Sequence, residues 1–81
     1  MIYDEIFQIV LENIEEKEIK IDFETEFQQI GITSISFINI IIKVEQKYQI
    51  EFPDEKLLLS EAGTIKKIGD IVTMVLSKNI Q

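Results

Sequence analysis

The sequence predicts an all-α protein, a small four-helix bundle with three main helices, one short helix and a long first loop. Apolar residues recur three and four positions apart in three segments, as they do on the buried side of a helix. No segment shows the two-residue alternation of a half-buried strand. Because no repeat or linker divides the chain, we expect residues 1–81 to form a single domain.

The first predicted helix covers residues 3–16. Its apolar stripe consists of Tyr3, Ile6, Phe7, Val10 and Ile14, with acids and Gln8 between them. From residue 18 to residue 33 this pattern breaks into isolated large side chains, and Gly31 closes the stretch. We expect a long loop held to the core by Ile19, Ile21, Phe23, Phe27 and Ile30. A loop of this length in a small domain usually has a functional reason.

The second predicted helix begins at Thr33 or Ser34, since both are good N-caps, and ends near Tyr48. The side expected to face the core consists of Phe37, Ile38, Ile41, Val44 and Tyr48. At about 100° per residue, the opposite side carries Ser36, Asn39, Lys43, Gln46 and Lys47. Ile35 and Ile42 lie between the two sides, so the core has the least need of them.

Pro53 stops any continuation of the second helix. Asp54 can cap a short helical turn through residues 57–59, and residues 62–64 form a connector. The last predicted helix covers residues 66–78, with Thr64 or Lys67 near its start. Its apolar stripe is Ile68, Ile71, Val72 and Val75.

Composition argues against several classes of function. The formal net charge is −7, and all eight basic residues are lysines, so the bidentate fork that arginine offers to phosphates is missing. We therefore expect no nucleic-acid partner. The chain has no histidine and no cysteine, which leaves no disulfide, no thiolate metal site and no nucleophile with an adjacent base. A metal site or a catalytic site is not expected.

The N-terminal segment is acidic, whereas a secretory signal begins with basic residues. Apolar runs such as Ile40–Ile42 are far shorter than the span of about 20 residues that a membrane helix needs. We expect a cytoplasmic protein with no membrane span, present as a monomer.

The segment Ile30-Gly31-Ile32-Thr33-Ser34-Ile35 resembles the attachment motif of the acyl and peptidyl carrier protein family. That motif has a hydrophobic residue, Gly, any residue, usually Asp, an invariant Ser, and then Leu or Ile. The resemblance covers nearly the whole chain. It includes Phe27 before the motif, Val44-Glu45 and Tyr48 in the following helix, residues 50–55 at the exit from that helix, and residues 68–72 in the last helix.

The resemblance implies an acyl-carrier-like bundle and a covalent 4′-phosphopantetheine group, moved from coenzyme A onto Ser34 by a phosphopantetheinyl transferase. The terminal thiol of the arm would then hold the cargo as a thioester. Ser34 would serve as the attachment point and perform no catalysis. The implied partners are this transferase, a loading ligase or adenylation enzyme, and downstream acyl- or peptidyl-transferring enzymes.

The position of Ser34 also makes physical sense without the resemblance. A serine at a helix N-terminus after a glycine turn can present its hydroxyl beside unpaired amides and the positive end of the helix dipole. A phosphodiester is favourable there. The structural alternative is that Ser34 only caps the helix. Ser36 is the nearest other hydroxyl, but it lacks a glycine three residues before it.

Two departures from the family pattern affect partner choice. Thr33 stands where Asp is usual, so it keeps the capping capacity and loses the charge. Carriers of fatty-acid synthesis typically have acids two and five residues after the serine, where this chain has Ser36 and Asn39. The residues expected to contact partners are Thr33, Ile35, Ser36, Asn39 and Ile42.

Three functional interpretations follow. The first is a discrete carrier for a specialised pathway, such as nonribosomal peptide or polyketide synthesis or a ligase-loaded system, which the weakly charged second helix favours. The second is the carrier of primary fatty-acid synthesis. The third, from a different class, is a helical protein-interaction module that is never modified.

Overall fold

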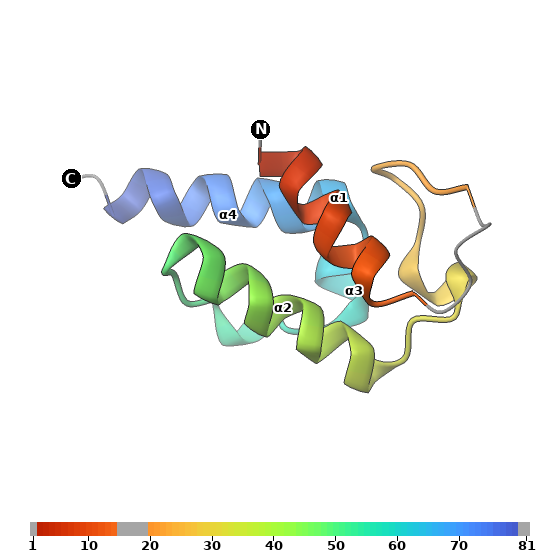
Figure 1. Cartoon of the computed structure of the whole chain (residues 1–81). Helices are drawn as coiled ribbons and strands as arrows, with labels where there is room; N and C mark the ends of the chain where they lie inside the picture. Colours follow the sequence, from red (N-terminus) through yellow and green to blue (C-terminus); the bar gives the residue numbers. More distant parts are fainter. Residues whose placement is uncertain (1, 15–19, 80–81) are drawn as a thin grey trace.

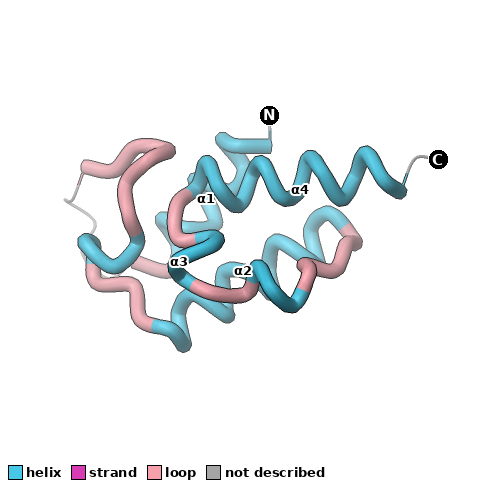
Figure 2. The backbone as a smooth tube through the Cα atoms, turned by 180° about the vertical axis from the view of Figure 1, so that it is seen from behind, coloured by secondary structure: helices cyan, strands magenta, loops and turns pink. Residues whose placement is uncertain are grey.

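The computed structural model describes residues 2–14 and 20–79, and it confirms the helical fold class (Figure 1). The helices of this part of the chain are α1 (Ile2–Glu12), α2 (Ser34–Tyr48), α3 (Leu59–Ala62) and α4 (Ile65–Asn79), with short 3₁₀ turns η1 (Phe27–Ile30) and η2 (Asp54–Lys56). Helix α1 packs most extensively on α4 and less on α2. The loop after α1 lies at the end of the bundle away from the C-terminal end of α4 (Figures 1 and 2).

The core is formed by isoleucine, valine and phenylalanine side chains from the three long helices and the first loop. Its most completely buried members are Ile6, Val10, Phe27, Phe37, Ile40, Ile41, Val44, Ile65, Ile68 and Val72. Full burial of one such side chain stabilises the fold by about 1.5–3 kcal/mol before the loss of conformational entropy is counted. The core therefore holds α1, α2 and α4 together in a chain without disulfides.

Helix α1 ends earlier than the sequence predicts. The Asn13 amide donates to the Val10 carbonyl at 2.9 Å, three residues back, and Asn13 Nδ2 donates to the Ile9 carbonyl at 2.9 Å. These two bonds satisfy carbonyls at the end of the helix and close it. Ile14 is still buried, as its place in the apolar stripe predicts. The remaining residues of the predicted helix, 15 and 16, and Ile19 of the predicted loop lie outside the described residues.

The first loop is held to the bundle, as predicted, and the strongest anchor is Phe27. Its side chain is 1% exposed, and its ring centroid lies 6.5 Å from that of Phe37. Backbone hydrogen bonds join the loop to the α3–α4 connector and to the start of α4: the Phe27 amide donates to the Gly63 carbonyl at 2.9 Å, and the Lys66 amide donates to the Phe23 carbonyl at 2.8 Å. The 3₁₀ turn η1 was not predicted.

Phe23 differs from the expectation that it anchors the loop in the core. Its side chain is 37% exposed. It packs on the outside of α1 instead, with its ring stacked on Tyr3 at 5.9 Å and edge-on to Phe7 at 6.0 Å. The loop therefore has an aromatic cluster on its surface in addition to its core anchor.

The buried side of α2 is rotated from the predicted one. Ile40 is fully buried, although the predicted stripe omits it, and Ile38 is 40% exposed, although the stripe includes it. Phe37, Ile41 and Val44 are buried as predicted. On a helix, Ile38 lies about 100° from Phe37, and Ile40 lies about 60° from it on the other side. The core surrounds Ile40 and leaves Ile38 at the surface.

The predicted short helix is divided into two pieces. Residues 54–56 form η2, Leu58 is 56% exposed, and α3 begins only at Leu59. The last helix begins at Ile65, one residue before the predicted start. Thr64, one of the two residues expected near its start, caps it, because Thr64 Oγ1 accepts a hydrogen bond from the Lys67 amide at 3.0 Å.

Tyrosine hydroxyls connect α1 to the other two long helices. The Tyr3 hydroxyl donates to the Asp70 carboxylate on α4, and the Tyr48 hydroxyl donates to the Glu5 carboxylate. Lys66 Nζ lies 3.1 Å from the same Asp70 carboxylate. The hydrogen bond from Tyr3, and then that from Lys66, lowers the pKa of Asp70.

Gly69 gives the Tyr3 ring the space that it occupies. A Cβ at position 69 would lie 2.2 Å from a ring carbon of Tyr3. We predict that Gly69→Ala lowers the free energy of unfolding by about 1 kcal/mol, because the cost of displaced packing exceeds the higher helix propensity of alanine. Urea unfolding measures the change. In a Tyr3→Ala background the same substitution should become neutral or stabilising, and an equal loss in both backgrounds would contradict this explanation.

The contacts of Asp70 predict a pH dependence. Its folded-state pKa is lowered, so its contribution to stability is present above the ordinary pKa and is lost as the pH falls through the folded-state value. We predict that Asp70→Asn reduces the loss of stability between neutral and acidic pH, measured as the difference in urea midpoint. Asp54→Asn, an exposed aspartate of η2, is the matched control and should leave this difference as it is in the unmodified sequence.

Candidate functional site

A glycine turn brings the chain to the start of α2. Gly31 has φ +80°, a left-handed conformation that favours glycine, and it ends η1. No atom lies within 4 Å of where its Cβ would be, so the backbone angle alone explains the residue type. Ile32 follows with 5% exposure, and its amide donates to the Phe27 carbonyl at 3.1 Å. These two residues fix the direction in which the chain enters α2.

Thr33 is the N-cap of α2. Its backbone is extended, with φ −82° and ψ 172°, and Oγ1 accepts a hydrogen bond from the Ser36 amide at 3.2 Å. Its carbonyl accepts from the Phe37 amide at 2.8 Å, which begins the helical ladder. Of the two caps that the sequence allows, the structure uses this one.

Ser34 is therefore the first residue of α2 and does not cap it. Its side chain is exposed and makes no hydrogen bond within the part of the chain that the structure describes. The rival hydroxyl, that of Ser36, is partly covered and lies 3.4 Å from Thr33 Oγ1. Of these two serines, Ser34 has the hydroxyl that a large external enzyme can reach.

The electrostatics at the start of α2 suit a phosphodiester. The first turn contains no acidic residue. The amides of Ser34 and Ile35 have no acceptor among the described residues, so they can donate to an external anion. The positive end of the helix dipole lies at the same place. These amides and the N-terminus of α2 would hold the phosphate of an ester on Ser34 Oγ, so the residues present fit this group.

The residues predicted to contact partners lie around Ser34 and along α2. Ile35 is 77% exposed and Ile42 is 43% exposed. Thr33 and Asn39 are exposed as well, and Ser36 is the partly covered member of the set. Sequence reasoning missed Ile38. Placing Ile40 in the buried stripe, at the helical spacing of three residues from Phe37 and four from Val44, would have moved Ile38 to the surface.

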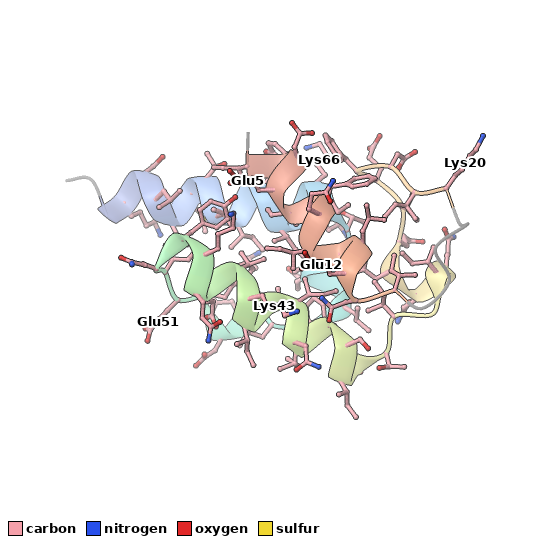
Figure 3. All side chains as sticks on the ribbon, viewed as in Figure 1. Glu5, Glu12, Lys20, Lys43, Glu51 and Lys66 are labelled. Atoms are coloured by element: carbon pink, nitrogen blue, oxygen red, sulfur yellow. The ribbon has the colours of Figure 1, made fainter. Side chains whose placement is uncertain are left out.

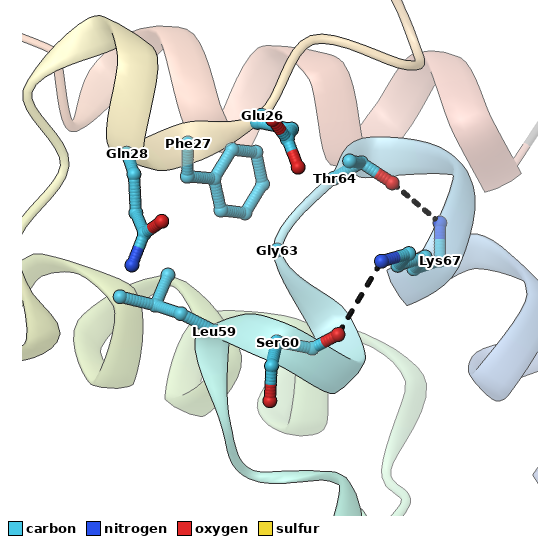
Figure 4. A pocket seen from close by; sticks show the side chains of 8 residues that line it. All are labelled: Glu26, Phe27, Gln28, Leu59, Ser60, Gly63, Thr64 and Lys67. Atoms are coloured by element: carbon cyan, nitrogen blue, oxygen red, sulfur yellow. Dashed lines mark hydrogen bonds between the residues drawn. The ribbon is translucent and has the colours of Figure 1, made fainter.

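A pocket of about 250 Å³ lies between η1 and α3 (Figure 4). Phe27 and Gly63 line its inner part, and its polar side chains include Lys67, whose Nζ donates to the Ser60 carbonyl at 3.3 Å. Ser34 does not line it. The pocket belongs to the contact between the first loop and the α3–α4 connector, which holds η1 and so the start of α2 in place.

Comparison with known proteins agrees with this geometry. A family model described as the phosphopantetheine attachment site matches residues 4–72. The acyl carrier protein of Wolinella succinogenes is 29% identical over 75 residues, which are 91% of this chain and 92% of that protein. An acyl carrier protein homolog of Mycoplasmopsis pulmonis is 37% identical over 60 residues, 74% of this chain and 75% of the homolog.

The match covers α1 from Asp4 onward, the first loop, α2, α3 and about the first half of α4, so it includes the elements that position Ser34. In the described part of the chain, no helix has the length and apolarity to cross a membrane. The chain belongs to the phosphopantetheine-attachment family of acyl and peptidyl carrier proteins, non-catalytic carriers with a covalently attached 4′-phosphopantetheine arm.

Proposed function

We propose that this chain is a free-standing carrier, one domain over residues 1–81, that holds acyl or aminoacyl intermediates as thioesters on an arm attached to Ser34. The observation that carries this proposal is the division of roles between two neighbouring hydroxyls. Thr33 satisfies the helix end, and the exposed Ser34 hydroxyl is left without an intramolecular partner in the described part of the chain. A serine that acted as the cap would have its oxygen directed at the helix amides.

The attachment step uses the Ser34 oxygen as the nucleophile. Ser34 Oγ forms a bond to the phosphorus that carries the pantetheine in coenzyme A, the pyrophosphate bond breaks, and adenosine 3′,5′-bisphosphate leaves. The serine proton passes to a base of the transferase, because the first turn of α2 has no acidic residue and the chain has no histidine to accept it. The amides of Ser34 and Ile35 then stabilise the negative charge of the ester. When attached, the arm supplies a terminal thiol that holds the cargo.

We further propose that the carrier serves a specialised pathway in which an adenylating ligase loads the arm. The support is the surface of α2, where Ser36 and Asn39 stand at positions that are typically acidic in carriers of fatty-acid synthesis. The exposed charged residues of this helix are Lys43 and Lys47. The second candidate is the carrier of primary fatty-acid synthesis, and the names of the relatives, which are acyl carrier proteins, fit both candidates. Partner enzymes of either kind would contact Thr33, Ile35, Ser36, Asn39 and Ile42.

Intact-mass measurement tests the attachment site. After incubation with coenzyme A and a broad-specificity phosphopantetheinyl transferase, the protein should gain the mass of one arm. Ser34→Ala should gain none, because the nucleophilic oxygen is removed. The matched control is Ser60→Ala, which removes another exposed serine at the start of a helix and should still gain one arm. If Ser34→Ala still gains the mass of an arm, the attachment site is another residue. If the unmodified sequence gains no mass with any transferase, an unmodified interaction module is favoured.

The start of α2 has unpaired amides and no acidic side chain, which predicts that the negatively charged arm stabilises the fold. A phosphodiester at the positive end of a helix contributes about 0.3–1 kcal/mol, so the melting temperature should rise by a few degrees on modification. Thermal unfolding of the two forms at about 0.15 M salt measures this, since distant charges are then largely screened. In Thr33→Asp, which already supplies a charge at the cap, the gain should be smaller. An unchanged or lower melting temperature in the unmodified sequence would contradict the prediction.

A further inference from the structure

The aromatic cluster of the first loop borders a recess between the loop and α1. This recess has a volume of about 420 Å³ and is lined by Phe7, Ile21, Asp22, Phe23 and Glu24. We call it the loop recess. Phe23 is 37% exposed, although the rings of two other aromatic residues lie within about 6 Å of its own. The recess therefore presents apolar ring surface that the fold itself does not cover.

The polar lining of the loop recess is acidic. Asp22 and Glu24 precede and follow Phe23, and both are exposed. Asp22 Oδ1 accepts hydrogen bonds from the Glu24 amide at 2.8 Å and from the Thr25 hydroxyl at 3.1 Å, which orient its carboxylate. Within the described part of the chain, the Glu24 carboxylate has no ion pair or hydrogen bond, and the residues that line the recess include no base. The recess thus offers negative charge next to an aromatic surface.

Two lysines lie near the loop recess, and neither supplies it with a cation. Lys66 Nζ of α4 lies 3.1 Å from the Asp70 carboxylate. The hydrogen bond with Asp70 is the main reason that the pKa of Lys66 is raised, and Glu24 contributes least. Lys20 is exposed, and Figure 3 shows its side chain pointing away from the bundle. The charge of Glu24 is therefore left for a group from outside the described residues.

The loop recess lies away from the attachment site. Its lining comes from α1 and the first loop, with no residue of α2. The loop segment 20–24 and the first turn of α2 lie at opposite edges of the molecule, as both views of the backbone show (Figures 1 and 2). A protein that occupied the recess would leave Ser34 open to a second enzyme.

We propose that the loop recess binds an arginine side chain of a partner protein, which holds the carrier while Ser34 stays accessible. A guanidinium is planar and always charged, so it stacks on the Phe23 ring and pairs with the Glu24 and Asp22 carboxylates. The recess is open to solvent, so a small free ligand would keep much of its surface in water, whereas a protein covers the surrounding surface as well. The net charge of −7 attracts a basic partner.

Titration of the isotope-labelled protein with a capped peptide, acetyl-Arg-Leu-Arg-amide, tests the site by NMR. The largest changes in amide shift should fall on residues 21–24 and around Phe7, and the start of α2 should change little. Two peptides serve as controls: lysine in place of arginine keeps the charge without the planar group, and citrulline keeps the shape without the charge. The arginine peptide should bind most tightly. Equal binding of the lysine peptide, or changes spread over all acidic segments, would overturn the proposal.

Two variants test the residues of the recess. Phe23→Ala should raise the dissociation constant of the arginine peptide roughly threefold to tenfold, because stacking on the ring is lost. Glu24→Gln should raise it about twofold to fivefold. The matched controls are Leu58→Ala, at an apolar side chain that is 56% exposed, and Glu55→Gln, at an exposed acid of η2. Effects of the controls equal to those of the recess variants would show that the recess is not the binding site.

Melting temperatures check that these variants keep the fold. Phe23→Ala retains the backbone carbonyl that accepts the Lys66 amide, so the loop keeps this connection to α4. If Phe23→Ala does not fold, Glu24→Gln and its control Glu55→Gln still decide the outcome, because neither replaces a buried side chain.

Arm attachment tests whether Ser34 stays accessible when the recess is occupied. The rate at which a broad-specificity transferase adds the arm, measured by intact mass, should be the same with and without a saturating amount of arginine peptide. A rate that the peptide lowers in the unmodified sequence and leaves unchanged in Phe23→Ala would overturn the separation of the two sites. The inference goes beyond the proposed function: if no transferase adds an arm, the carrier function fails, and the peptide titration still decides the inference.

A second copy of this chain is the other possible occupant. All eight basic residues of the chain are lysines, so another copy has no guanidinium to offer. Analytical ultracentrifugation should therefore find a monomer. A dimer that Phe23→Ala dissociates would show that a second copy covers the loop recess, and it would overturn the proposal.

Discussion

The hydrogen bond from the Ser36 amide to Thr33 Oγ1 determines which chemistry is open to the start of α2. A capping hydroxyl is directed at the amides of the first helical turn, whereas an attachment hydroxyl must face solvent and an incoming enzyme. One side chain cannot do both at once. Because Thr33 performs the first task, Ser34 is exposed. The left-handed turn at Gly31 and the buried Ile32 serve this arrangement by bringing Thr33 to the capping position.

The position of Ser34 also depends on the first loop, which a few contacts hold to the core and to the segment that leads into α4. The Phe27 side chain enters the core beside Phe37, while its amide binds the carbonyl of Gly63. The Phe23 carbonyl accepts the Lys66 amide in the first turn of α4. These bonds connect the loop to α4 without passing through α2. The position of Ser34 is therefore determined by the packing of segments on both sides of it in the sequence.

The periodicity of apolar residues predicted the three long helices, because each buries a stripe that recurs at the helical spacing. The periodicity predicted the buried side less well where several apolar residues are adjacent in the sequence. Four isoleucines at 38, 40, 41 and 42 fit more than one stripe, and only burial in the core of the folded protein distinguishes Ile40 from Ile38. Likewise, three consecutive leucines do not reveal where α3 begins. The motif identified Ser34 as the candidate site, whereas the choice of Thr33 as the cap depends on backbone geometry that two adjacent capping residues leave open.

Attachment of the proposed arm at Ser34, the first residue of a fifteen-residue helix, would give the tether a fixed base. A flexible tether raises the local concentration of what it carries to an order of millimolar around its anchor. Since Ser34 and the exposed side chains of Ile35, Ile38 and Ile42 belong to the same helix, the base of the tether keeps one distance and direction to that surface. A partner that binds this helix would thereby also select the region of space that the cargo samples, so specificity for the carrier becomes control over where a thioester is delivered.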